Sequence, residues 1–285
     1  MRCRLLLAAW LASFAVNAAS FSLTDDRGKA HDLPASSARI VTLAPHLTEL
    51  VYAAGAGDRL IAVDGASDYP PAVHDLPRIG DASRLDFEAM LQLRPDLVLA
   101  WRSGNNAADI AQLERLGLDV FVTEPERLSD IARLLRVIGH LAGSETAAAA
   151  AAQRFEAELD ALRARYRGRR EVSVFYQIWY PPPMTVNRAH AISDALGVCG
   201  ARNVFADLPQ LAGAVATEAV VAINPEAMVL ADGAPDAEAA WRRFADMRAV
   251  RANKFYTVTP DLLHRAGPRM LQGVAELCEK IDQAR

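Results

Sequence analysis

The chain of 285 residues has no long hydrophobic run. Its most apolar stretch, Leu5–Val16, is shorter than the roughly 20 residues that a membrane-spanning helix needs. No later stretch is both long enough and apolar enough to cross a membrane. The sequence therefore predicts a protein that is not an integral membrane protein.

The chain has fewer basic than acidic residues. The chain has 31 Lys and Arg against 35 Asp and Glu, and its formal net charge is −4. Nucleic acids and anionic membrane surfaces attract basic proteins, so neither is an expected partner of this acidic chain.

The first residues have the pattern of an export signal. Arg2 and Arg4 precede the apolar stretch, and Ala18-Ala19 offers small residues for cleavage. We expect residues 1–19 to be a signal peptide that is removed on export to the periplasm. Cys3 lies ahead of the apolar stretch instead of at the cleavage site, so we expect no lipid anchor.

Cysteine is scarce, with 3 residues in the chain. Once Cys3 leaves with the signal peptide, Cys199 and Cys278 remain as an even pair in an oxidising compartment, which favours a disulfide. Closing so long a loop would stabilise the fold by roughly 4–5 kcal/mol on the loop-entropy model. Two separately buried thiols are the alternative. Neither cysteine has the spacing of a metal or redox motif.

Motifs that would name a reaction or a resident metal are lacking. The sequence has no Gly-X-Ser-X-Gly, no His-Glu-X-X-His and no phosphate-binding glycine loop. Its 6 histidines show no short metal-ligand spacing. We therefore expect neither an enzyme nor a protein with a metal or cofactor. A secreted enzyme and a zinc or manganese receptor are the alternatives.

The chain does contain an internal repeat. The stretch from Glu88 to Leu99 resembles the stretch from Glu218 to Val229, at one offset (218 − 88 = 130), and Pro95 matches Pro225 at the same offset. Each copy has an acidic residue, a short helical stretch, a proline that ends it and an aliphatic run typical of a buried parallel strand. Two copies predict two similar lobes with a cleft between them.

A long stretch of high helix propensity lies between the copies. Residues 144–168 include the run Ala147–Ala152 and would form a rod of about 35 Å at 1.5 Å per residue. We predict an α/β protein with two Rossmann-like lobes, 39–143 and 169–285, joined by this one long backbone helix. Residues 20–38 are expected to form a leader segment or an edge hairpin.

Four stretches carry a resemblance to a known family: Arg39–Pro45, Thr48–Leu50, Ser67–Pro71 and Arg94–Arg102. Together they resemble the periplasmic vitamin B12-binding proteins of ABC importers, which belong to the helical-backbone (class III) substrate-binding proteins. Shorter matches such as Val198-Cys199-Gly200 extend the likeness over nearly all of the mature chain.

The resemblance implies two α/β lobes joined by one long helix, with the ligand held in the cleft between them. The implied ligand is a corrinoid, foremost vitamin B12, delivered by a monomeric receptor to an inner-membrane permease dimer with its ATPase subunits. The resemblance also implies a disulfide between Cys199 and Cys278. The alternative cargo on the same fold is haem, an iron siderophore or another metal chelate.

The candidate ligand contacts combine the resemblance with position in the chain. Trp101 matches a family aromatic and ends a predicted strand, where α/β proteins bind ligands. Trp179 and Tyr180 stand beside the position of another family aromatic, and Asp261 and Arg265 match the ends of a ligand-contacting loop. The last two candidates are His46 and Tyr69. His46 directly follows the first predicted strand. The alternative role of Tyr69 is to stiffen a turn.

This sequence departs from the family at several aromatic positions. Ala66 stands where a tyrosine is expected, and Ala82 and Ala212 stand where tryptophans are expected. A large flat ligand needs apolar and aromatic area, so these positions put the identity of the ligand in question.

The resemblance also implies one docking glutamate on each lobe for arginines of the two permease subunits. Glu88 and Glu218 match these positions and begin the two copies of the repeat. A twofold permease needs equivalent charges at equivalent places. The alternative role of each glutamate is to stabilise the start of its helix through the helix dipole.

Overall fold

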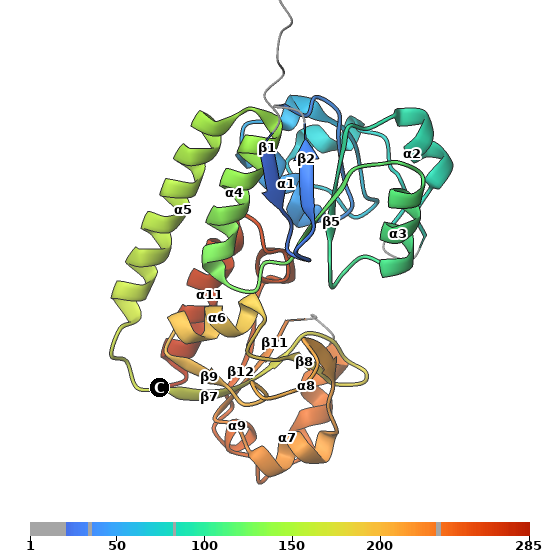
Figure 1. Ribbon diagram of the computed structural model, residues 1–285. Helices are drawn as coiled ribbons and strands as arrows, with labels where there is room; N and C mark the ends of the chain where they lie inside the picture. The colour runs from blue at the N-terminus through green and yellow to red at the C-terminus, as the bar shows by residue number, and fades with distance from the viewer. Residues whose placement is uncertain (1–20, 34–35, 82–83, 232–234) are drawn as a thin grey trace, which may run out of the picture.

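The computed structural model describes residues 21–33, 36–81, 84–231 and 235–285. The predicted signal peptide and Ala82 lie outside this part of the chain. The described residues form two α/β lobes, one above the other in Figure 1, with the helix α5 (Glu145–Tyr166) running alongside both. The predicted fold class is confirmed. The boundaries of the lobes and of the leader segment stay predictions.

The N-terminal lobe, or N-lobe, is built on a parallel sheet of four strands in the order β4-β3-β5-β6. These strands are β3 (Ile40–Thr42), β4 (Leu60–Val63), β5 (Leu97–Trp101) and β6 (Val120–Thr123). The helical segments of this lobe are α1 (Pro45–Ala53), η1 (Gly57–Arg59), η2 (Pro71–Asp75), α2 (Phe87–Leu93), α3 (Ala107–Arg115) and α4 (Leu128–Ala142).

Side chains of β5 alternate between the two faces of this sheet, as the period of a strand requires. Leu97 and Leu99 belong to the buried cluster that includes α1 and α4, whereas Val98 and Ala100 pack in the cluster that includes α3 and Met90 of α2. Helices therefore cover both faces, which explains why the strand is aliphatic at every position up to Trp101.

The C-terminal lobe, or C-lobe, repeats this architecture with a parallel sheet in the order β12-β11-β7-β9. Its strands are β7 (Val172–Gln177), β9 (Ala201–Asn203), β11 (Ala227–Leu230) and β12 (Phe255–Thr257). Its helices are α6 (Ala191–Val198), α7 (Thr217–Ile223), α8 (Pro235–Arg242), α9 (Arg248–Arg251), α10 (Pro260–Leu263) and α11 (Met270–Gln283).

The internal repeat corresponds to the same unit in both lobes. The helices α2 and α7 keep the offset of 130 residues in their bounds (217 − 87 and 223 − 93) and precede the third strand of their sheets along the chain, β5 and β11. Each helix ends at a residue in the left-handed region, Arg94 with φ 45° and Asn224 with φ 54°, directly before a proline. Helix, break and strand thus follow one another in each lobe as the repeat predicts.

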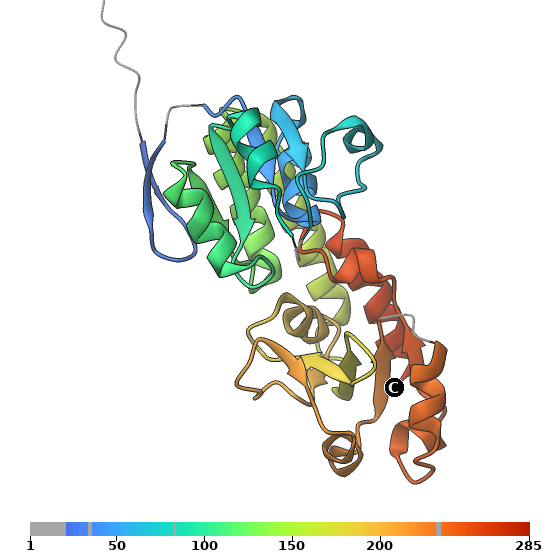
Figure 2. The ribbon, with the colours of Figure 1, turned by 90° about the vertical axis from the view of Figure 1, so that its right-hand side faces the viewer.

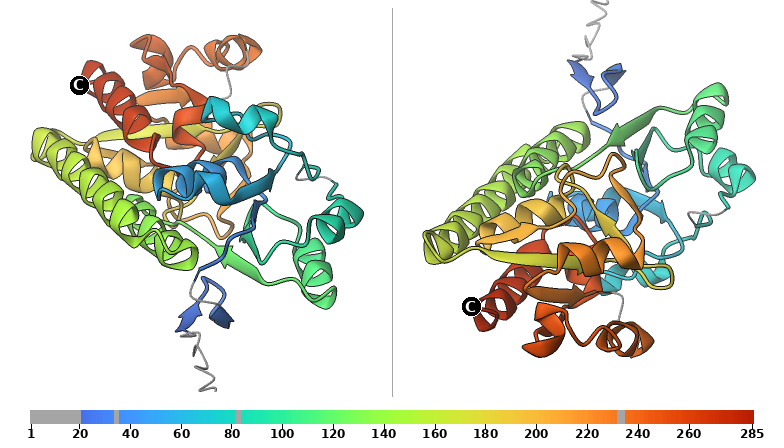
Figure 3. Two further views of the ribbon diagram at one scale, coloured as in Figure 1. Left: turned by 90° about the horizontal axis from the view of Figure 1, so that it is seen from above. Right: turned by 90° about the horizontal axis from the view of Figure 1, so that it is seen from below.

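The helix α5 links the lobes, as Figure 3 shows from above and below. It contacts α1 and α4 of the N-lobe and α6 and α11 of the C-lobe. A methyl group at Gly139 of α4 would lie 2.2 Å from Cβ of Ala148, so the glycine allows α4 and α5 to approach closely. Ser144 precedes α5, but its hydroxyl donates to the carbonyl oxygen of Ala54 (2.7 Å) instead of capping the helix. One buried apolar cluster contains residues of both lobes and of α5.

Two small hairpins complete the fold. β1 (Phe21–Thr24) and β2 (Ala30–Leu33) pair antiparallel, and the turn between them bonds to the edge strand β6 of the N-lobe through Asp25 and Asp26. β8 (Met184–Val186) and β10 (Ala212–Ala214) pair antiparallel in the C-lobe. The first hairpin covers a sheet edge that would otherwise be open.

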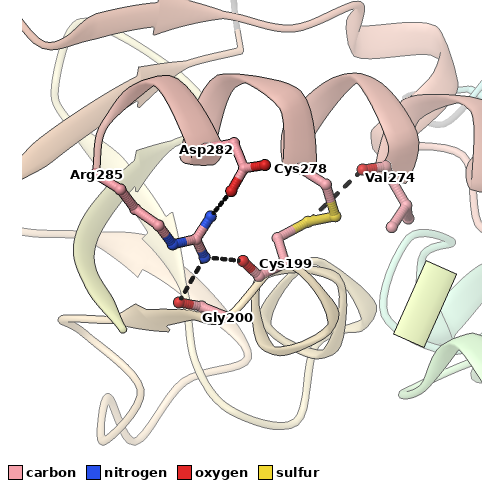
Figure 4. Close-up of a disulfide and its surroundings, with 6 residues drawn as sticks. All are labelled: Cys199, Gly200, Val274, Cys278, Asp282 and Arg285. Atoms are coloured by element: carbon pink, nitrogen blue, oxygen red, sulfur yellow. Dashed lines mark hydrogen bonds and ion pairs between the residues drawn. A yellow bond between two sulfur atoms is a disulfide. The ribbon is translucent and has the colours of Figure 1, made fainter. Parts of the chain in front are cut away.

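A disulfide joins Cys199 to Cys278, and this prediction is confirmed. Figure 4 shows that it connects the end of α6 to α11, with the guanidinium of Arg285 donating to the carbonyl oxygen of Cys199 at 2.6 Å. Within the described residues, no helix is long and apolar enough to cross a membrane.

Candidate ligand-binding cleft

The carboxyl ends of the two parallel sheets border a cavity of about 470 Å³, here called the cleft. Trp101 and Ser103 come from the end of β5 in the N-lobe, and Ile178 and Trp179 follow β7 in the C-lobe. The other lining residues are Met184, His190, Ile192, Leu211, Ala212 and His264. Most of the lining is apolar or aromatic, with a few polar groups, as is usual for small-molecule sites.

Trp101 is held from several sides. Its indole Nε1 donates to Oε1 of Glu124 (3.1 Å), and its backbone nitrogen donates to Oδ1 of Asn105 (2.7 Å). The ring of His46 meets the indole edge-on, with ring centroids 5.1 Å apart. A methyl group at Gly104 would lie 1.8 Å from Cε3 of Trp101, so only a glycine leaves room for the ring in this position. The predicted ligand contact is therefore a pre-organised aromatic surface.

Glu124 follows the carboxyl end of β6 and is buried beside Trp101. Its Oε1 also accepts a hydrogen bond from Ser103 (3.0 Å), and its Oε2 lies 3.4 Å from Nε of Arg102. Its backbone nitrogen donates to Asp26 (2.6 Å), which ties this edge of the cleft to the first hairpin.

Three histidines lie in or next to the cleft: His190 and His264 line it, and His46 is buried against Trp101. His46 is 3% exposed, and burial together with the positive charge of Arg265 lowers its pKa to about 3. His190 precedes α6 and accepts a hydrogen bond from the backbone of Ile192; burial and the neighbouring His264 lower its pKa to about 4. Both imidazoles are therefore neutral at physiological pH.

Trp179 and Tyr180 are neighbours in sequence but differ in surroundings. Trp179 lines the cleft and is 57% exposed, so its indole is open to a ligand. Tyr180 packs against the buried cluster on the outer face of the C-lobe sheet and does not line the cleft. Ala212 lines the cleft, whereas Ala66 is exposed.

The remaining candidate contacts gather in an ionic cluster between the lobes. Arg265 pairs with Asp261 (3.0 Å) and with Asp68 and Glu49 of the N-lobe, and the hydrogen bond from Arg265 is the main cause of the lowered pKa of Asp68. Arg269 stacks over the ring of Tyr69, with 3.9 Å from its guanidinium carbon to the ring centroid. Tyr69, Asp261 and Arg265 are thus together but do not line the cleft, and their contact with a ligand stays a prediction.

Glu88 and Glu218 are both exposed in the first turns of α2 and α7. Gln92 donates to Glu88 at 3.4 Å, one turn along the helix. Their matching positions in the two lobes suit the predicted docking role, which stays a prediction.

Sequence reasoning missed His190 and His264, which line the cleft, and Glu124, which bonds to the indole of Trp101. Glu124 directly follows a predicted strand, which is the same signal that marked Trp101. His264 lies inside the loop between Asp261 and Arg265, and His190 precedes a predicted helix. Within the described residues, no group of three or more His, Cys, Asp and Glu could hold a metal ion.

Comparisons with known proteins agree with this architecture. The sequence profile of the periplasmic binding protein family matches residues 40–262. The vitamin B12-binding protein of Vibrio cholerae serotype O1 (strain ATCC 39541 / Classical Ogawa 395 / O395) is 33% identical over 246 residues, which cover 86% of this chain and 89% of that protein.

Solved structures give the same result. The periplasmic vitamin B12-binding protein BtuF of Vibrio cholerae superposes with a TM-score of 0.81 at 32% identity, covering 87% of this chain and 98% of that one. A periplasmic haem-binding protein from Pseudomonas aeruginosa superposes with a TM-score of 0.72 at 27% identity, covering 85% and 91%. This chain belongs to the periplasmic binding protein family.

Proposed function

We propose that this chain is a periplasmic receptor that captures a corrinoid, foremost vitamin B12, between its lobes and delivers it to an ABC importer. The lining of the cleft carries the proposal: Trp101 and Trp179 come from different lobes, and most of the other lining side chains are apolar. The similarity to vitamin B12-binding proteins supports the same ligand class.

The charge of the lining favours a corrinoid over haem. A smaller hollow shares Trp101, His190 and His264 with the cleft. Of the described residues that line the cleft and this hollow, Glu124 is the one acidic residue, and none is lysine or arginine. The propionates of haem would meet no cation on this lining, and Arg265 nearby is already paired with three carboxylates. The side chains at the edge of a corrinoid, in contrast, are mostly neutral amides. Burying unpaired carboxylates is unfavourable, so this lining suits the neutral ligand.

Haem, an iron siderophore or another metal chelate is the second candidate. The observation that favours it is Ala212, which lines the cleft where the vitamin B12-binding proteins are expected to have a tryptophan. The similarity to a haem-binding protein at 27% identity is consistent with it.

The proposed cycle has three steps. The ligand binds in the cleft, with Tyr69, Asp261 and Arg265 as further contacts at its rim, since both neighbours of Arg265, His264 and Ala266, line the cleft or the smaller hollow. Glu88 and Glu218 then dock onto the two permease subunits. Finally the permease, driven by its ATPase subunits, separates or distorts the two lobes of the receptor, and the ligand is released.

The proposed receptor is a monomer that works in the periplasm after loss of residues 1–19, without catalysis and without a cofactor. A continuous helix α5 and a buried cluster shared by both lobes limit closure. Small-angle scattering should therefore give nearly the same radius of gyration with and without ligand, and a large decrease would refute the rigid-lobe mechanism.

Equilibrium dialysis of the mature protein tests the proposed ligand class. Cyanocobalamin, haemin and a ferric hydroxamate are offered in separate chambers, and bound ligand is measured by visible absorbance. We expect retention of cyanocobalamin at one per protein, recovered chemically unchanged after prolonged incubation. Retention of haemin or the hydroxamate alone would show that the ligand belongs to the second candidate class.

A further inference from the structure

The smaller hollow next to the cleft, here called the chamber, has Trp101 in its lining. This chamber has a volume of about 20 Å³ and shares Trp101, His190 and His264 with the lining of the cleft. Its other lining residues are His46, Glu124, Pro125, Ala191, Leu263, Ala266 and Met270. A volume of this size holds one group as large as a water molecule.

Two polar atoms of the chamber's lining residues are buried without a hydrogen-bond partner. They are Nε2 of His46 and Oε2 of Glu124. Across the part of the chain that the structure describes, such atoms number four, the others being Oγ of Ser37 and Oγ1 of Thr185. Arg102 approaches Oε2 of Glu124 to 3.4 Å as an ion pair, without the geometry of a hydrogen bond. Buried polar atoms are nearly always paired in native proteins, so these two atoms have unused hydrogen-bonding capacity beside the chamber.

The chemistry of these two atoms defines the missing group. A carboxylate oxygen only accepts hydrogen bonds, and a neutral imidazole accepts at its unprotonated nitrogen. In the tautomer that carries its proton on Nδ1, Nε2 of His46 is an acceptor, and a group that pairs with both atoms must carry two N–H or O–H donors and be no larger than a water molecule. The NH₂ end of a primary amide meets both conditions.

We propose that the chamber is a subsite for one primary carboxamide at the edge of the ligand, whose N–H groups donate to Oε2 of Glu124 and Nε2 of His46. The proposal rests on the proposed function, since a corrinoid carries such amides at its edge. It adds a basis for selectivity that the aromatic surfaces cannot give, because stacking does not distinguish an amide from an acid.

The subsite rejects a carboxylate in the same position. Neither a lysine nor an arginine is among the described residues that line the chamber or the cleft, and a second carboxylate would face Glu124. Like charges in a partly desolvated site disfavour the wrong ligand strongly.

Calorimetry with cyanocobalamin and its monocarboxylic acid derivatives, each with one edge amide hydrolysed, tests this subsite. The wild-type protein should bind at least one monoacid more than tenfold more weakly than the parent. In Glu124→Gln, whose amide can donate to a carboxylate, the ratio of the dissociation constant of that monoacid to that of the parent should fall at least fivefold. Glu126→Gln is the matched control: this exposed glutamate also pairs with Arg102 but does not line the chamber, so its ratio should equal that of the wild type.

Two results would overturn the subsite. The first, which needs no variant, is a wild-type protein that binds the parent and every monoacid within threefold of one another. The second is an unchanged ratio in a folded Glu124→Gln protein. A wild-type protein that binds no cobalamin at all would instead refute the proposed function, and the subsite with it.

Discussion

Glu49 and Arg269 are 220 residues apart in sequence, yet two hydrogen bonds of 2.6 and 2.9 Å join their side chains. Glu49 lies in α1 of the N-lobe, and Arg269 directly precedes α11, whose second half is tied to α6 of the C-lobe by the disulfide at Cys278. Helix α11 is therefore a second connection between the lobes beside α5, visible in Figure 2 as the red helix.

Removing Glu49 should weaken this connection. The carboxylate is buried and pairs with two arginines, so Glu49→Ala leaves a partly buried guanidinium without its partner. We expect the free energy of unfolding in urea to fall by about 3 kcal/mol. Glu156→Ala, which breaks the exposed pair with Arg136, is the control and should cost about 1 kcal/mol or less. Equal losses in the two variants would contradict the role given to Glu49.

Gly104→Ala should weaken ligand binding. The added methyl group would collide with the indole of Trp101 and push it out of the position that borders the cleft. We expect the dissociation constant for cyanocobalamin, measured by calorimetry, to rise at least tenfold. Gly197→Ala is the control, because its methyl group would meet no atom within 4 Å, and it should leave affinity unchanged. Unchanged affinity in Gly104→Ala would show that Trp101 does not contact the ligand in this position.

Acid should destabilise the protein through His46. Its pKa is about 3 in the folded protein, lowered by burial and then by Arg265, against about 6.5 in the unfolded chain. As the pH falls below 6.5, the unfolded chain takes up a proton that the folded protein does not, so stability falls until the pH reaches about 3. Between pH 7 and pH 5, this histidine should cost roughly 2 kcal/mol.

Urea unfolding at the two pH values checks this contribution. The stability of His46→Asn should decrease by roughly 2 kcal/mol less than that of the wild type over the same interval. His74→Asn, at an exposed position, controls for the loss of a histidine as such. Parallel decreases in wild type and His46→Asn would mean that folding does not lower the pKa of His46.

Glu88→Ala with Glu218→Ala should separate docking from binding. Both side chains are exposed at the starts of equivalent helices and do not line the cleft, so the double variant should keep the affinity for ligand within twofold. Vitamin B12 uptake by cells that depend on this receptor should fall more than tenfold. The control is Glu158→Ala, another exposed glutamate, on α5, which should support normal uptake. A loss of affinity in the double variant would contradict the docking role.

The fold was predictable because its signals are local. Proline ends α2 and α7 at the same repeat position, aliphatic runs mark the covered strands β5 and β11, and the alanine-rich stretch predicts α5. The pairing of Cys199 with Cys278 followed from counting and from the family resemblance.

The cleft was only partly predictable, because its residues meet through tertiary contacts. Trp101 and Glu124 come from adjacent strands, but the hydrogen bond between them depends on side-chain orientation that no sequence period encodes. The short strands β8 and β10 lack a hydrophobic pattern, and so the cleft wall that they form was missed. The pairing of Arg269 with Glu49 depends on the docking of the loop before α11 onto α1, which is equally invisible in the sequence.

Calorimetric titration of the mature protein with cyanocobalamin tests the central claim most directly, with Trp101→Ala titrated in parallel. The account predicts one binding site of sub-micromolar dissociation constant in the wild type and a loss of affinity of at least tenfold in the variant. An absence of binding heat with cyanocobalamin at several temperatures, with haemin binding instead, would contradict the claim. Ala66 and Ala212 would then indicate a different ligand.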